Sequence, residues 1–173
     1  MLWLAVCGLV MFSGLVAAQN NSANRMMNLM DSTFTTKAAQ GGMAEVQMAQ
    51  LAEEKTSDPA VKAFAQRMIT DHTRLNNELQ GIAAKQNITM PTSMAANDQQ
   101  TYDRLQNLSG AAFDKTYMPA QVSAHRAAIG LFEHEAQHGT NATLMQFASN
   151  ALPTLRAHLK LAEQTESQVK TEK

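Results

Sequence analysis

Four polar side chains occupy positions where the surrounding pattern predicts apolar core residues: Glu45, His72, His125 and His158. Three imidazoles and a carboxylate form a ligand set that suits zinc first, and also iron, manganese or copper. A buried polar group without a partner costs about 1–3 kcal/mol, and a whole domain is stable by only about 5–15 kcal/mol. These groups must therefore meet one another, a divalent metal ion or water. The sequence favours a mononuclear metal site, and a buried polar network that holds water is the alternative.

The element that must position His72 is an amphipathic helix over residues 61–83. Its apolar residues recur every three or four positions, which is the period of one helix face. They are Val61, Phe64, Met68, Leu75, Leu79 and Ile82. His72 falls on this face, between Met68 and Leu75. A titratable ring therefore replaces the aliphatic residue that the pattern predicts.

The other three polar residues belong to three further predicted helices, each with the residue on its apolar face. Glu45 lies in a helix that starts near Asp31 or Ser32 as capping residue and ends near residue 55. His125 lies in residues 111–138, and His158 in residues 142–168. Four helices of this kind, each contributing one polar side chain, predict a shared site in the core.

Short links between helices predict which helices are neighbours. Asp58 and Pro59 predict the start of the helix that carries His72, so the first two helices are expected to be antiparallel neighbours. Glu45 lies about eleven residues before that link and His72 about thirteen after it, which places them at similar heights. Residues 41–42, both glycine, lower helix stability and predict either a closely approaching neighbour helix or room for a bulky group.

The connection between the second and third helices is long. Residues 87–100 show no clear periodicity, and residues 102–108 predict a short helix before Ser109 and Gly110. A connection of this length can travel along the whole bundle, as in ferritin-like topologies. Pro119 either kinks the third helix or marks its first turn, and the second option would move His125 away from mid-helix.

Other polar residues near these positions have separate interpretations. Asp71 and Tyr117 are candidates to orient an imidazole through its second nitrogen. The run at residues 133–138 contains a Glu-x-x-His spacing, but His134 lies on the opposite helix face from His125. We therefore interpret His134 and His138 as a solvated helix end, with adventitious surface metal binding as the alternative.

The N-terminal segment differs from the rest of the 173 residues. Residues 1–18 are almost wholly apolar and end in small residues, which predicts a signal peptide cut near Ala18, with an uncleaved anchor as the alternative. Cys7, the only cysteine, lies in it, so the mature chain would hold no disulfide or thiolate site. Residues 19–30 are expected to be a flexible leader, residues 31–168 a four-helix-bundle domain, and residues 169–173 a fraying tail.

Composition supports an all-α protein. Hydrophobic residues make up 45% and charged residues 17%, while aromatic residues reach only 5%, and strong helix formers are plentiful. The net charge of −1 gives no indication of a nucleic-acid partner. No membrane span is expected in the mature chain, and protein partners cannot be named from the sequence.

An ordered set of motifs is shared with a known family. In order, they are Gly42-x-x-Glu45, Val61-Lys62-x-Phe64-Ala65 with Met68-x-x-Asp71-His72, Phe113-Asp114-x-x-Tyr117, Gln121-Val122-x-x-His125, and Leu152-Pro153-x-Leu155-x-x-His158-Leu159. Over roughly residues 32–162 the chain resembles the bacterial family called domain of unknown function 4142. That resemblance implies an exported periplasmic or outer-membrane protein with a ferritin-like four-helix fold, and no established activity. Ile69 and Leu155 stand where di-iron proteins of this fold have Glu, so ferroxidase or oxygenase chemistry is not implied.

The functional hypothesis that follows is an exported helical bundle with a buried metal site and a metal-binding or stress-related role. The sequence shows no open coordination position or substrate cleft, which favours a binding protein over an enzyme. A structural or interaction module of the cell envelope is the alternative, with the polar quartet setting helix register. A metal-dependent oxidase or peroxide-handling protein is a third hypothesis.

Overall fold

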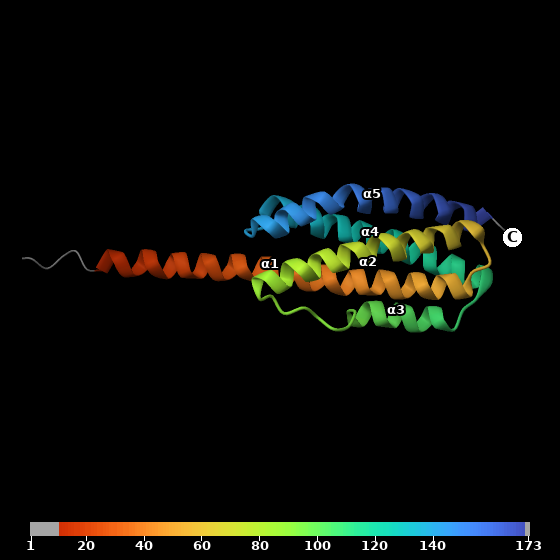
Figure 1. Ribbon diagram of the computed structural model, residues 1–173, viewed down its shortest axis with the longest axis horizontal. Coiled ribbons are helices and arrows are strands. Elements are labelled where there is room, and N and C mark those ends of the chain that lie inside the picture. Colours follow the sequence, from red (N-terminus) through yellow and green to blue (C-terminus); the bar gives the residue numbers. More distant parts are fainter. Residues whose placement is uncertain (1–10, 172–173) are drawn as a thin grey trace, which may run out of the picture.

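The computed structural model describes residues 11–171 and contains five helices (Figure 1). They are α1 (Met11–Lys55), α2 (Pro59–Gln86), α3 (Ala96–Gln106), α4 (Gly110–His138) and α5 (Ala142–Thr171). Residues 11–171 contain no strand, so the prediction of an all-α chain is confirmed. Cys7 and the first ten residues of the expected signal peptide lie outside the described residues. No helix in the described part of the chain is long and apolar enough to cross a membrane.

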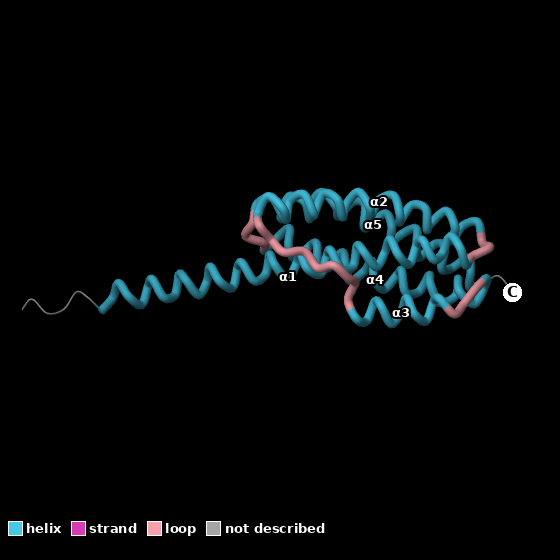
Figure 2. Tube along the Cα trace, turned by 60° about the horizontal axis from the view of Figure 1, so that its bottom comes forward, coloured by secondary structure: helices cyan, strands magenta, loops and turns pink. Residues whose placement is uncertain are grey.

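The four long helices lie side by side, and α1 extends well beyond the others at its N-terminal end (Figure 1). α1 packs against α2 and α4, and α5 packs against α4 and α2. The shorter α3 lies on the outside, against α1 and α4. The loop that leads from α2 to α3 runs along the side of the molecule (Figure 2). Each of α1, α2, α4 and α5 therefore has two long neighbours around a common interior.

Polar side chains cap the starts of α2 and α5. The Asp58 carboxylate accepts hydrogen bonds from the backbone N–H groups of Ala60 and Val61, at 2.7 and 3.0 Å. Asn141 does the same for Thr143 and Leu144, at 3.0 and 3.2 Å. These bonds satisfy N–H groups that have no partner within a helix, so both predicted helix starts are confirmed.

The predicted start of the first helix near Asp31 is wrong, because α1 begins at Met11 and continues through residues 19–30. No proline or glycine interrupts residues 19–30. Asp31 is buried within the helix, and its carboxylate accepts hydrogen bonds from the N–H and hydroxyl of Thr140, at 2.9 and 2.6 Å. Asp31, which the sequence predicts as an N-cap, therefore connects α1 to the loop between α4 and α5 through these two hydrogen bonds.

Three further findings concern the connection, the place of Pro119 and the C-terminal helix end. α3 begins six residues before the predicted start of the short helix and ends two residues before its predicted end. Pro119 lies inside α4, not in its first turn, so His125 remains in the middle of that helix. α5 continues to Thr171, and Val169 in the predicted tail is buried.

The core consists of two apolar clusters separated by a polar layer. One cluster contains Met48, Phe64, Met68, Phe113, Tyr117 and Val122. The other contains Phe34, Leu75, Leu79, Phe132, Phe147 and Leu155. Along α2, for example, His72 comes after Met68 of the first cluster and before Leu75 of the second. The four polar residues predicted to share a site come from this layer between the clusters, and all four are buried.

Candidate metal centre

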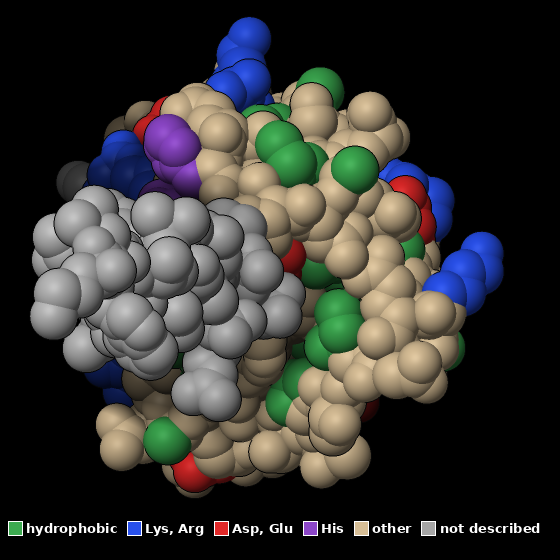
Figure 3. Space-filling view, turned by 90° about the vertical axis from the view of Figure 1, so that its left-hand side faces the viewer, with side chains coloured by type: hydrophobic (Ala, Val, Ile, Leu, Met, Phe, Trp, Pro, Cys, Tyr) green, Lys and Arg blue, Asp and Glu red, His purple; other side chains and the backbone are tan. Residues whose placement is uncertain are grey.

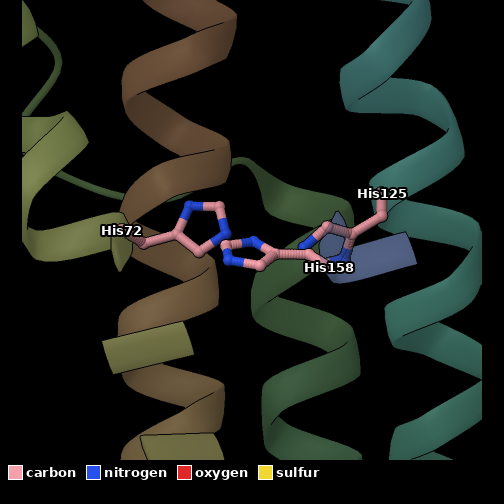
Figure 4. A group of neighbouring side chains, drawn as sticks. All are labelled: His72, His125 and His158. Carbon is pink, nitrogen blue, oxygen red and sulfur yellow. The ribbon is translucent and has the colours of Figure 1, made fainter. Parts of the chain in front are cut away.

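Three of the four predicted ligands meet in the polar layer. His72 from α2, His125 from α4 and His158 from α5 are buried, and one nitrogen from each lies within 4.8 Å of the other two (Figure 4). The ring centroids are 5.3–5.6 Å apart. The three rings thus face a common point from three helices, which is a ligand arrangement for one metal ion.

Hydrogen bonds fix the orientation of two of these rings. His125 Nδ1 lies 2.9 Å from the backbone carbonyl of Gln121, so this nitrogen carries the proton. His158 Nε2 lies 2.8 Å from an oxygen of Asp71 and donates to it in the same way. The second nitrogens, His125 Nε2 and His158 Nδ1, are buried without a hydrogen-bond partner, as is His72 Nε2. Two of the three inward nitrogens therefore present lone pairs.

Burial favours the neutral, metal-binding form of two of these rings, His72 and His158. Burial lowers the pKa of His72 well below its usual value of 6.5, and the neighbouring His125 and His158 lower it further. Burial also lowers the pKa of His158 to about 4, although the hydrogen bond to Asp71 acts in the opposite direction. Metal binding requires an unprotonated nitrogen, so neither ring needs to release a proton near neutral pH.

Glu45 lies beside this cluster and is not part of the three-residue group. Its Oε1 is 3.9 Å from His125 Nδ1, the nitrogen that faces the Gln121 carbonyl, and its Oε2 has no partner. Burial raises the pKa of the Glu45 carboxyl, while His125 and a hydrogen bond from the Gln121 side chain act against that rise. The structure thus places the predicted carboxylate ligand next to one imidazole, on the side away from its free nitrogen.

Asp71 and Tyr117, the two predicted orienting residues, have different surroundings. Asp71 contacts His158 of α5, not the adjacent His72, and also accepts from Arg67 Nε at 2.6 Å. Burial favours a higher pKa for Asp71, but the hydrogen bonds from Arg67 and His158 outweigh it and the pKa is lowered. The Tyr117 hydroxyl is buried without a partner, and burial followed by nearby Glu45 raises its pKa well above 10.0. The carbonyl that orients His125 belongs to Gln121, which sequence reasoning missed.

An open cleft of about 920 Å³ borders the cluster on one side. Its lining includes Glu45, His72, Gln121 and His125, but not His158. Sequence reasoning missed this cleft, although the pair of glycines in α1 was a signal for it, because both line it. Gly42 allows close approach, since a Cβ there would lie 1.9 Å from the Asn76 side chain.

The run at the end of α4 is partly as predicted. His134 and His138 are exposed, with ring centroids 4.9 Å apart. Since the other three histidines are buried, the histidine surface in the end-on view of Figure 3 belongs to this pair. Glu135, however, is buried, and burial together with Asp31 raises its pKa to about 7. Glu135 follows Phe132 of the apolar face by three residues, a helical spacing that predicts burial on the same face, and this signal was missed.

The described chain is thus an all-helical protein with a buried cluster of three histidines beside an open cleft. Residues 16–165 match the model of the family described as Domain of unknown function (DUF4142), and the chain belongs to this family. The resemblance drawn from the ordered motifs is therefore confirmed. No curated protein matches the chain.

Solved structures of similar fold include two DUF305 proteins and CopM. A fragment from Deinococcus radiodurans has a TM-score of 0.71 at 10% identity, covering 80% of this chain and 96% of that one. A Streptomyces coelicolor DUF305 protein described as a putative secreted protein has a TM-score of 0.71 at 13% identity, covering 83% of this chain and 94% of that one. CopM in its Cu(I)-bound form has a TM-score of 0.66 at 16% identity, covering 80% and 96%. At these identities the similarity concerns the fold.

Proposed function

We propose that this chain is an exported metal-binding protein in which His72, His125 and His158 hold one transition-metal ion. The observation that carries the proposal is the convergence of three buried imidazoles whose inward nitrogens have no partner in the protein. Glu45 lies behind His125, next to the ring nitrogen that faces away from the ion, and a negative charge there would add to the attraction for a cation.

A cation and a single water molecule are the two occupants that suit this cluster. His125 and His158 donate from their outer nitrogens to Gln121 and Asp71, so their inward nitrogens can only accept. One water molecule satisfies all three nitrogens only if His72 carries its proton on Nε2, because the water then donates to two rings and accepts from the third. A metal ion accepts a lone pair from all three rings at once. The carboxylate of Asp71 behind His158 is the type of partner that metal-bound imidazoles use.

The chemistry of the ligands limits the metal. Imidazole suits zinc, copper and iron, whereas magnesium and calcium prefer oxygen ligands. Three histidines with one open position are a typical zinc arrangement, so zinc remains the first candidate, followed by iron, manganese and copper. The fold shared with Cu(I)-bound CopM adds support for copper.

We further propose the finer architecture and location. The four long helices form a ferritin-like bundle domain over residues 31–168, and the segment with α3 is its crossover. The apolar residues 1–18 act as an export signal, which the fold shared with a Streptomyces coelicolor protein described as a putative secreted protein supports. The chain then functions in the periplasm or outside the cell, as a binding protein and not as an enzyme. Mass spectrometry of the purified protein tests this, because cleavage near Ala18 removes the segment and an uncleaved anchor retains it.

The decisive experiment measures bound metal in the tag-free mature protein by elemental mass spectrometry. We expect about one ion per chain in the wild type, and its loss in His72→Ala, His125→Ala and His158→Ala. The matched control is the double variant His134→Ala/His138→Ala, which removes two exposed imidazoles and should keep the ion. Substoichiometric metal in the wild type, or loss only in the control, would contradict the proposal and favour the water-filled network.

Thermal unfolding provides an independent check. An ion bound only by the native state stabilises it by about 2.7 kcal/mol when its free concentration is 100 times Kd. For a chain of this size, each kcal/mol corresponds to about 2–4 °C in Tm. We therefore expect a chelator to lower Tm by about 5–10 °C in the wild type and in the surface control. A structural module without metal would show the same Tm with and without chelator.

A further inference from the structure

The last turn of α4 carries a second group of histidines, which the buried cluster does not use. The chain has five histidines, and His134 and His138 are the two that are exposed (Figure 3). They are four residues apart, so both rings lie on one face of the helix. Within residues 11–171, neither ring has a hydrogen-bond or salt-bridge partner. Their nitrogens are therefore available to a ligand from solvent.

The separation of the two rings suits one shared metal ion. A metal about 2.1 Å from one nitrogen of an imidazole lies about 3.2 Å from the centroid of that ring. Two such rings at a ligand–metal–ligand angle of about 90–110° have their centroids about 4.5–5.2 Å apart. The centroids of His134 and His138 are 4.9 Å apart. The pair is thus spaced as two neighbouring ligands of one ion.

The charges around the pair favour a cation. His138 is the last residue of α4, and the carbonyl groups at the C-terminal end of a helix carry partial negative charge. The carboxylate of Asp31 reaches the same end of α4, where it accepts hydrogen bonds from the N–H and hydroxyl of Thr140. A positive ion at the histidine pair therefore meets both a helix end and a carboxylate of opposite charge.

The spacing His134-Glu135-x-x-His138 is also that of zinc hydrolases, in which the Glu acts as general base. The structure argues against this chemistry, because Glu135 is 2% exposed and its carboxyl group bonds to Asp31 inside the protein. The exposed pair also lacks a third ligand: in the described part of the chain, only the buried cluster brings three ligand atoms together. The pair is therefore suited to binding an ion whose other positions hold water.

We propose that His134 and His138 form a second, exposed site for a divalent transition-metal ion, with Cu²⁺ bound most tightly. Cu²⁺ has the highest affinity among such ions for nitrogen ligands, and its square-planar geometry accepts two neighbouring imidazoles. Two protein ligands in contact with solvent release the ion readily. The site is occupied while free metal is present and is emptied by desalting, so it does not add to the metal that the buried cluster retains. It goes beyond the proposed function because it uses none of the three buried rings.

The test follows the backbone amide signals of the isotope-labelled mature protein by NMR while Cu²⁺ is added. One equivalent of Zn²⁺ is present beforehand, which fills the buried cluster if that cluster binds metal. Because Cu²⁺ is paramagnetic, it broadens the signals of residues near it. We expect the signals of residues 134–140 to disappear at substoichiometric Cu²⁺ and to return with a chelator. If these signals persist while others broaden, the exposed site is overturned.

A displaced pair is the matched control for the spacing. The variant His138→Ala/Gln164→His keeps two exposed histidines but separates them, because Gln164 is exposed on α5 about 30 Å along the helix from its start. Two rings that bind one ion together gain affinity over two independent rings. We expect the Kd for Cu²⁺, measured by competition with a chromophoric chelator, to rise at least tenfold in this variant and in His134→Ala/His138→Ala. An equal Kd in wild type and displaced pair would mean adventitious binding to single imidazoles and would overturn the site.

A variant of the buried cluster separates this inference from the proposed function. His72→Ala removes one of the three buried ligands and should leave the broadening of residues 134–140 by Cu²⁺ unchanged. If His72→Ala abolishes that broadening, the two sites are not independent and the inference is wrong. If the wild type retains no metal after desalting but shows the local broadening, the proposed function fails while the exposed site stands.

Discussion

Asp71 should control metal affinity through a residue on another helix. Its Oδ2 accepts from His158 Nε2 at 2.8 Å, which keeps the proton on that nitrogen and leaves Nδ1 free for the ion. Loss of such a carboxylate partner typically lowers metal affinity by about 10–100-fold. This factor corresponds to about 1.4–2.7 kcal/mol. We therefore expect Asp71→Ala to raise the Kd for the ion by one to two orders of magnitude, measured by competition with a chromophoric chelator.

The same substitution should lower the stability of the metal-free protein. His158 is 1% exposed, so the lost bond leaves a buried N–H without a partner, at a cost of about 1–3 kcal/mol. The ion pair of Asp71 with Arg67 is lost as well, but the Arg67 side chain is 56% exposed and such pairs contribute about 0–1 kcal/mol. Urea unfolding of the metal-free variant measures the sum.

Two further variants make this prediction refutable. Arg67→Ala removes only the exposed ion pair, so its metal affinity should stay near that of the wild type. Asp71→Asn keeps an oxygen that can accept from His158 and should fall between wild type and Asp71→Ala. If Asp71→Ala unfolds more easily but binds the ion with unchanged Kd, Asp71 supports the fold alone and our account of His158 orientation is wrong.

Two other predictions concern parts of the molecule outside the metal site. Gly41→Ala should stabilise the metal-free protein by about 0.5–1 kcal/mol in urea unfolding, because a Cβ there meets nothing within 4 Å and alanine favours the helix. Gly42→Ala should lack this gain, because its Cβ would lie 1.9 Å from the Asn76 side chain, which must move. Burial and Asp31 raise the pKa of Glu135 from 4.5 to about 7. Between these two pH values the native state keeps a proton that the unfolded chain releases. The free energy of unfolding therefore falls as the pH rises through this range. The stability of the wild type relative to Glu135→Gln should therefore drop by about 1–2 kcal/mol between about pH 5 and pH 8, a value reduced for solvent screening, and equal pH profiles would refute this.

The helices themselves were predictable from local sequence because local chemistry determines them. Asp58 and Asn141 cap α2 and α5 as their types predict. The start of α1 was not predictable, because Asp31 has the type and position of an N-cap but its carboxylate is used by Thr140, 109 residues away in the chain. A capping residue identifies a helix start only when no tertiary partner competes for its side chain.

The three histidines that form the site were predictable from the helical periodicity, but the orientation of their rings was not. A histidine on an apolar stripe, such as His72, must lie in the interior, and three such stripes bring three rings together. Which nitrogen faces the ion depends on the outer partner of each ring. That partner is a backbone carbonyl for His125 and a carboxylate from another helix for His158. Small changes in helix rotation decide these contacts, and a pattern of residue types does not encode them. The place of Glu45 beside His125 has the same origin.

The positions of the three histidines couple metal binding to the joining of two helix pairs. α1 packs extensively on α2, and α4 on α5, whereas the contacts of α1 with α4 and of α2 with α5 are less extensive. His72 belongs to the first pair, and His125 and His158 belong to the second. An ion bound by all three rings therefore connects the pairs across their smaller interfaces. Its removal leaves unpaired nitrogens where the packing between the long helices is less extensive. The free energy of metal binding is thus expected to stabilise mainly the docking of the two helix pairs, with little effect on the pairs themselves.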